Sequence, residues 1–106
     1  MQRLKVEVLL PKFHNDGRPV EGAKYRETYQ EVFRQFGGCT TDPSPLIGRW
    51  LDPNTHKAYN ERNIAFWVIC DDTSDSIYFL NNLKDKLKVR FDQKEILMYS
   101  IRVEVF

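Results

Sequence analysis

Two histidines, His14 and His56, carry the only imidazole groups among the 106 residues of this chain. An imidazole can act as a general base or bind a metal ion near neutral pH. Both histidines fall in expected loops, and no carboxylate stands at a fixed spacing from either of them. We therefore interpret both as exposed loop residues, and the sequence predicts no metal site.

Two cysteines, Cys39 and Cys70, are the candidate thiol nucleophiles. Cys39 follows an expected helix end, and the negative end of a helix does not favour a thiolate. Neither cysteine is part of a C-x-x-C pair, so a structural zinc site is not expected. Because both lie among apolar residues, we interpret them as free buried thiols, with one disulfide between them as the alternative.

Acidic and aromatic residues supply the remaining candidates for chemistry. Asp71, Asp72 and Asp75 could bind a magnesium ion, but capping and the helix dipole favour acids at a helix start in any case. The aromatic residues that could stack on nucleic-acid bases are Trp50, Phe66, Trp67 and Tyr99. The third expected strand lacks the glycine and flanking arginines of RNA-binding sheets, and the formal net charge is only +1. Nucleic acid is therefore not an expected partner.

Hydropathy periodicity predicts the first elements that would position these residues. Apolar residues alternate from Leu4 to Leu10, which is typical of a strand, and Pro11 ends it. Residues 21–36 show the three- and four-residue spacing of an amphipathic helix. The glycines at 37–38 supply the left-handed residue that commonly ends a helix.

The second half of the chain predicts two more strands around a second helix, after a less regular segment. A strand could begin at Cys39, but the prolines within 42–45 break or bulge it before extended structure resumes at 46–51. Residues 63–70 are apolar on both faces, which is typical of a central strand. A helix begins after residues 71–74 and runs to Phe91, and residues 95–106 form the last strand.

This order of elements is the split βαββαβ pattern of ferredoxin-like folds. It predicts an α+β protein of one domain, residues 1–106, with a four-stranded antiparallel sheet and both helices on one face. The spatial order of the strands would be fourth, first, third, second. That order places the two most apolar strands at the centre of the sheet.

One face of such a sheet carries no helix, and the sequence makes that face apolar. If Leu4 to Leu10 face the helices, Lys5, Glu7 and Leu9 point away, and the third strand presents apolar side chains to either side. An exposed apolar face of this kind is unusual in a monomer. We predict that it is buried in a homodimer or larger homo-oligomer, or that it encloses a ligand. In the alternative, the long 42–62 segment folds back over it.

Three short motifs resemble those of a group of small uncharacterised bacterial proteins. They are F-G-G-C-T at 36–40, G-R-W at 48–50 and R-F-D-Q at 90–93. The resemblance implies a ferredoxin-like fold and brings no established activity. In physical terms, Gln93 would cap the second helix or tie the last strand to the loop. Trp50 would wall a cavity between the second strand and the helices.

Two classes of function fit these observations. The first is an oligomerising binding or interaction module with a small-molecule pocket. The second is a small cofactor-independent enzyme, similar to dimeric ferredoxin-like oxygenases and isomerases. No catalytic residue is assigned and no cofactor is expected. The candidate pocket residues are His14, Tyr25, Cys39, Trp50, His56 and Gln93.

The sequence also predicts a cytoplasmic protein without membrane contact. Lys5 and Glu7 interrupt the N-terminal apolar stretch, and no small-residue cleavage site follows it. No apolar run approaches the ~18 residues that a spanning helix needs.

Overall fold

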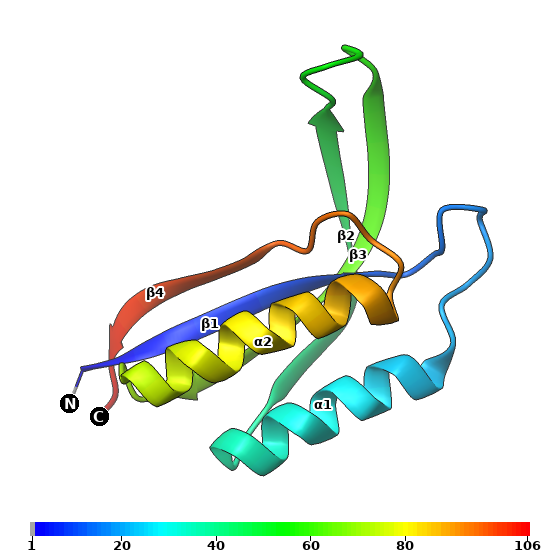
Figure 1. The fold of residues 1–106 in the computed structure, drawn as a ribbon. Helices are drawn as coiled ribbons and strands as arrows, with labels where there is room; N and C mark the ends of the chain where they lie inside the picture. The colour runs from blue at the N-terminus through cyan, green and yellow to red at the C-terminus, as the bar shows by residue number, and fades with distance from the viewer. Residues whose placement is uncertain (1) are drawn as a thin grey trace.

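The computed structural model describes residues 2–106, which form four strands and two helices in the expected order (Figure 1). The elements are β1 (Gln2–Pro11), α1 (Gly22–Phe36), β2 (Thr40–Leu51), β3 (Ala58–Cys70), α2 (Ser74–Arg90) and β4 (Met98–Glu104). The strands form one antiparallel sheet in the spatial order β2-β3-β1-β4. The prediction of a ferredoxin-like fold, with β1 and β3 at the centre of the sheet, is therefore confirmed.

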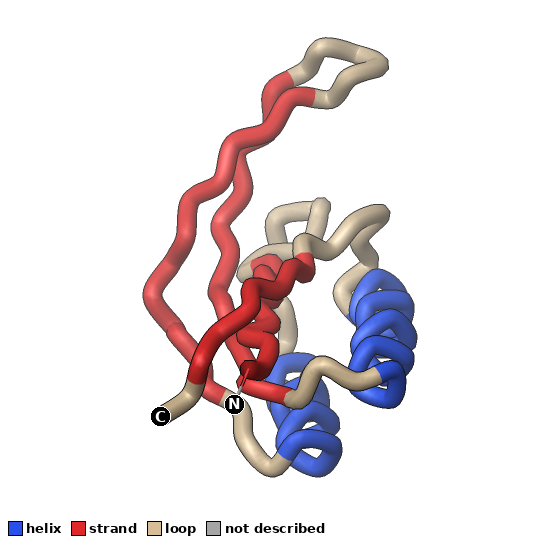
Figure 2. Tube along the Cα trace, turned by 90° about the vertical axis from the view of Figure 1, so that its left-hand side faces the viewer, coloured by secondary structure: helices blue, strands red, loops and turns tan. Residues whose placement is uncertain are grey.

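Both helices cover the same face of the sheet, and the other face, called here the open face, has no helix over it (Figure 2). Side chains that are cross-strand partners leave the sheet on the same side. Val6 pairs with Val68 and Val8 with Phe66, and all four are buried against the helices. The other main members of this core are Leu4, Leu10, Cys70, Leu80, Leu83, Leu87 and Phe91. The face of β3 that the sequence left undecided is thereby settled, because Ala65, Trp67 and Ile69 lie on the open face.

The end of α1 and the start of α2 lie at residues whose chemistry favours them. Gly37 ends α1 with a φ of 78°, a left-handed conformation that glycine adopts without steric cost. Thr73 caps α2, because its hydroxyl oxygen accepts a hydrogen bond from the backbone N–H of Ser76 at 3.2 Å. No helix within residues 2–106 is long and apolar enough to span a membrane.

Arg90 joins the two helices at one end of the helical layer. Its guanidinium donates from Nη1 to Oγ1 of Thr28 at 2.9 Å and from Nη2 to Oε1 of Glu31 at 2.8 Å. Its side chain is only 12% exposed, and a buried cation must have its donors satisfied. The arginine of the R-F-D-Q motif therefore has a structural role.

The largest difference from the predicted elements lies between β2 and β3. Pro43 and Pro45 do not interrupt β2, because it is an edge strand in which an unpaired backbone nitrogen costs little. Of the two predicted outcomes, a break or a bulge, the structure shows the bulge, because the register with β3 shifts between Asp42 and Leu46 and pairing continues to Leu51. Because Leu51 of β2 pairs with Ala58, β3 begins at Ala58, earlier than the predicted residue 63.

The outer part of this hairpin, residues 46–62, projects beyond the rest of the molecule (Figures 1 and 2). The alternative in which the 42–62 segment folds back over the open face is therefore wrong. The two strands pair with each other along this length, which satisfies their backbone groups in an extended ribbon.

The last strand is shorter than the predicted 95–106. Asp92 has a positive φ of 51°, and the backbone N–H of Gln93 donates to the carbonyl of Lys88 at 2.8 Å. The chain therefore turns tightly after α2 and packs Ile96 into the core before β4 begins at Met98.

Candidate functional site

An aromatic pair and a carboxylate form a cluster on the projecting hairpin. Trp50 of β2 lies opposite Tyr59 of β3, and their rings stack with centroids 4.7 Å apart and planes inclined by 17°. The indole Nε1–H of Trp50 donates a hydrogen bond to Oε1 of Glu61 at 2.9 Å. Trp50, Tyr59 and Glu61 are called the hairpin cluster below.

Local strand pairing explains why these three side chains meet. Trp50 and Tyr59 are cross-strand partners, so their side chains leave the same face of the hairpin. Glu61 follows Tyr59 by two residues and therefore points to that face as well. Its own partner across the hairpin is Gly48, whose missing side chain leaves the Glu61 carboxylate free to reach the indole.

The hairpin cluster has the chemistry to bind a flat or positively charged ligand. Trp50 is 45% exposed, and Glu61 is exposed as well. Aromatic faces attract planar rings by stacking and cations through the ring quadrupole. Lys57 already holds its ammonium group 5.3 Å from the centre of the Tyr59 ring. The Glu61 carboxylate would balance a positive charge on a ligand at the same place.

The hairpin cluster is continuous with the open face of the sheet. Side chains alternate along β3, so Tyr59 and Glu61 share a face with Ala65, Trp67 and Ile69. A ligand bound to the hairpin cluster would therefore lie on the same side of the sheet as any partner that covers the open face.

The centre of the open face carries three polar or charged residues, Lys5, Glu7 and Tyr99, among apolar side chains. Lys5 places its ammonium 4.8 Å from the centre of the Trp67 ring. The hydroxyl of Tyr99 donates to the carboxylate of Glu7, and this hydrogen bond raises the pKa of Tyr99. Tyr99 and Ile101 remain 43% and 52% exposed. The sheet thus presents apolar side chains that the chain itself does not bury.

His14 and Tyr25, two of the predicted pocket residues, make structural contacts around the loop after β1. His14 Nε2 lies 3.1 Å from both carboxylate oxygens of Glu21, at the start of α1. Hydrogen bonds from the backbone and from His14 lower the pKa of Glu21 to about 2. Tyr25 donates its hydroxyl to the carbonyl of Pro11 at 2.6 Å, and burial raises the pKa of Tyr25 to about 12.

Gln93, a third predicted pocket residue, lies near the same loop and caps α2. Its Nε2 donates to the carbonyl of Phe91 at 3.2 Å and to Oδ1 of Asn15 at 3.4 Å. The amide therefore satisfies a carbonyl at the end of α2 and holds the loop after β1 against it.

Cys39 lies apart from these three residues, after α1. It is half-buried against the core, and burial raises the pKa of its thiol. Burial also raises the pKa of the Cys70 thiol. Both cysteines are free, so the disulfide considered from the sequence is not formed. A raised pKa leaves little of the nucleophilic thiolate at neutral pH.

Trp50 and His56 lie on the hairpin, well away from the helices. Trp50 does not wall a cavity beside them, because the hairpin carries it beyond the helical layer (Figure 1). His56 occupies the turn at the tip with a φ of 59°, and its backbone N–H donates to the carbonyl of Asp52 at 2.8 Å. The six predicted residues therefore lie in three places rather than around one pocket.

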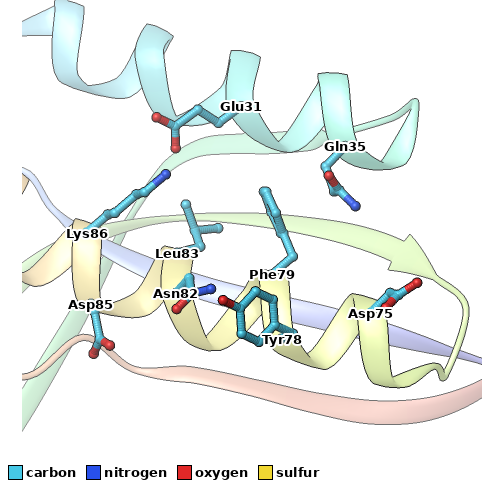
Figure 3. A pocket seen from close by; sticks show the side chains of 9 residues that line it. All are labelled: Glu31, Gln35, Asp75, Tyr78, Phe79, Asn82, Leu83, Asp85 and Lys86. Atoms are coloured by element: carbon cyan, nitrogen blue, oxygen red, sulfur yellow. The ribbon is translucent and has the colours of Figure 1, made fainter.

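A groove of about 680 Å³ lies between α1 and α2, and none of the six residues lines it (Figure 3). Its lining residues are Glu31, Gln35, Asp75, Tyr78, Phe79, Asn82, Leu83, Asp85 and Lys86. Within residues 2–106, no group of three histidine, cysteine or acidic residues is placed to hold a metal ion. Asp71 and Asp72 instead pair with Arg3 and Arg102 at 3.5 and 3.4 Å.

Sequence analysis missed Tyr59 and Glu61. The signal that could have revealed them is the sequence D-P-N-T-H at 52–56, which is typical of a turn. A hairpin around that turn places Trp50 opposite Tyr59. The polar run 60–63 interrupts the apolar pattern, so hydropathy alone predicts the third strand only from residue 63.

No protein-family model matches the chain, and no curated protein matches its sequence. Among the solved structures that share its fold are two ligand complexes. A phage SAM lyase in complex with S-methyl-5′-thioadenosine matches 98% of this chain and 92% of its own, with a TM-score of 0.67 and 10% identity. GlnK from B. subtilis in complex with ATP matches 94% of this chain and 82% of its own, with a TM-score of 0.51 and 15% identity. These likenesses establish the fold.

Proposed function

We propose that this protein is a homo-oligomeric small-molecule-binding module. The copies associate through the open face, and the ligand binds where the hairpin cluster of one copy meets the covered face. The observation that carries the proposal is the continuity of these two surfaces along β3. Burial of exposed apolar side chains such as Ile101 stabilises an oligomer. A second copy would supply the surface that encloses a ligand against the hairpin cluster.

We propose a 5′-substituted adenosine as the ligand class. Two proteins that share this fold, the phage SAM lyase and GlnK, hold S-methyl-5′-thioadenosine and ATP, and both of these ligands contain adenosine. The Trp50–Tyr59 stack offers a face for a purine ring, since stacking contributes about 1–3 kcal/mol per base. Glu61 can accept a hydrogen bond from a ribose hydroxyl or an exocyclic amine.

Native mass spectrometry, followed by calorimetric titration with S-methyl-5′-thioadenosine and with ATP, tests this proposal. We expect an oligomer and saturable binding of at least one of the two ligands. An Ile101→Glu variant should lose association through the open face and lose binding, while Ile77→Glu on α2, which is 40% exposed and lies on the helix side of the sheet, is the matched control. A monomer that binds neither ligand would contradict both parts of the proposal.

A lyase acting on the sulfonium compound S-adenosylmethionine is the second candidate, and it is the enzyme alternative. The observation that favours it is the Glu61 carboxylate beside two aromatic rings, which suits a cationic substrate. Incubation with S-adenosylmethionine, with chromatography of the products, tests it. Release of S-methyl-5′-thioadenosine above the uncatalysed rate, absent in Glu61→Gln, would establish the lyase. Binding of S-adenosylmethionine without release of S-methyl-5′-thioadenosine would contradict the lyase and support the binding module.

A further inference from the structure

One stripe of α2 runs along the groove between α1 and α2 (Figure 3). Its members, spaced alternately by three and four residues, are Asp75, Tyr78, Asn82, Asp85 and Val89. Tyr78 and Val89 are 72% and 84% exposed. Neither acid of the stripe forms an ion pair within residues 2–106. The stripe is therefore acidic with two uncovered apolar positions.

The hairpin has a second face, opposite the hairpin cluster, with the complementary character. Ile47, Arg49 and Leu51 of β2 share it, and the register adds Arg62 of β3. Ile47 and Leu51 are 78% and 58% exposed. The two arginines are also exposed, and within the described part of the chain no carboxylate pairs with either of them.

We propose that the second face of the hairpin docks against the α2 stripe of a second copy of this chain. Ile47 and Leu51 are four strand residues, or about 13 Å, apart. Tyr78 and Val89 are eleven helical residues, or about 16 Å, apart. The two apolar positions of the hairpin therefore match the two of the stripe.

Charge completes the match between the two surfaces. Arg49 stands midway between Ile47 and Leu51, and Asp85 stands between Tyr78 and Val89. When the apolar positions align, the guanidinium lies beside the carboxylate. Glu31 in the groove is paired with Arg90, so the carboxylates of Asp75 and Asp85 face one lining cation, Lys86.

The placement of the two surfaces allows a closed, reciprocal contact. Along β3, Arg62 follows the same alternation as Phe66 and Val68, so the second face of the hairpin points to the helix side of the sheet. The hairpin projects beyond the helices of its own chain, which leaves room beside it for the helices of another copy (Figure 2). A two-fold axis then places each hairpin on the other copy's stripe. The open face takes no part, so this inference is independent of the proposed function.

Charge reversal with rescue tests this contact. The variants are Arg49→Glu and Asp85→Lys, both at exposed positions, and circular dichroism confirms that each is folded. Sedimentation velocity at 50 mM and 500 mM salt measures association. All chains also carry Ile101→Glu, which removes association through the open face and makes the hairpin contact visible alone.

We expect the Ile101→Glu chain to dimerise at low salt and to dissociate at high salt, because the contact contains ion pairs. Each charge reversal should weaken dimerisation at least tenfold. An equimolar mixture of the two variants should dimerise again, because each hairpin then meets a stripe of opposite charge. A mixture that stays monomeric, or reversals that leave dimerisation unchanged, would overturn the proposal. An Ile101→Glu chain that is monomeric at every concentration would overturn it as well.

Discussion

The indole nitrogen of Trp50 and the carboxylate of Glu61 are joined by a hydrogen bond across the projecting hairpin, at 2.9 Å. This bond fixes an acid beside the exposed Trp50–Tyr59 stack, far from the helices. A carboxylate held at the edge of an aromatic stack favours ligands that carry both a flat ring and a positive charge. The relationship therefore makes a prediction about ligand charge.

Glu61→Gln should discriminate between cationic and neutral adenosine ligands. The glutamine keeps an oxygen that can accept from Trp50 but removes the negative charge. We expect the affinity for S-adenosylmethionine, a sulfonium cation, to fall about tenfold, which corresponds to about 1.4 kcal/mol. The affinity for uncharged S-methyl-5′-thioadenosine should change less than threefold. Paired calorimetric titrations measure both values, and equal losses for the two ligands would remove charge balance as the role of Glu61.

Arg90→Met should destabilise the fold by leaving buried polar groups without a partner. Arg90 donates to Thr28 and Glu31 with a side chain that is only 12% exposed. Loss of hydrogen bonds to a charged group costs about 2 kcal/mol. Urea denaturation measures this change in the free energy of unfolding. Arg102→Met is the matched control, because its pair with Asp72 is exposed and should contribute little.

Glu21→Gln should reduce the loss of stability at acid pH. The pKa of Glu21 is lowered to about 2 in the folded protein from an ordinary value of 4.5. A lowered folded pKa gives a stabilising contribution that is complete above 4.5 and is lost as pH falls toward 2. Thermal unfolding between pH 6 and pH 2 should show a shallower fall in Tm for the variant. Identical pH profiles would show that Glu21 contributes nothing to acid sensitivity.

Both thiols should react slowly with iodoacetamide at neutral pH. Burial raises the pKa of Cys39 and of Cys70, and the reactive species is the thiolate. Mass spectrometry should find both cysteines largely unmodified under conditions that fully label the urea-unfolded chain. Rapid labelling of Cys39 in the folded protein would instead restore it as a candidate nucleophile.

Local patterns were sufficient to predict the fold from the sequence. The alternation from Leu4 to Leu10 and the apolar run 63–70 indicated the two central strands, because burial imposes a period of two or removes polar residues altogether. The end of α1 and the start of α2 were also predictable. Gly37 adopts the left-handed conformation that ends α1, and Thr73 accepts a hydrogen bond from a backbone N–H at the start of α2. Element order then led to the ferredoxin-like topology.

The candidate site was much less predictable, because it depends on pairing between residues distant in sequence. His14, Tyr25 and Gln93 have reactive side-chain types, but tertiary contacts with Glu21, Pro11 and the end of α2 commit them to structural roles. No local pattern contains those contacts.

The sequence by itself determined which elements form, in what order, and that one sheet face would be apolar. Only the tertiary structure decided that residues 46–62 extend the sheet instead of covering it, which leaves the open face uncovered. It also brought Glu61 to Trp50, because the register of β2 on β3 is set after the bulge between Asp42 and Leu46. A shift of one residue would place these side chains on opposite faces.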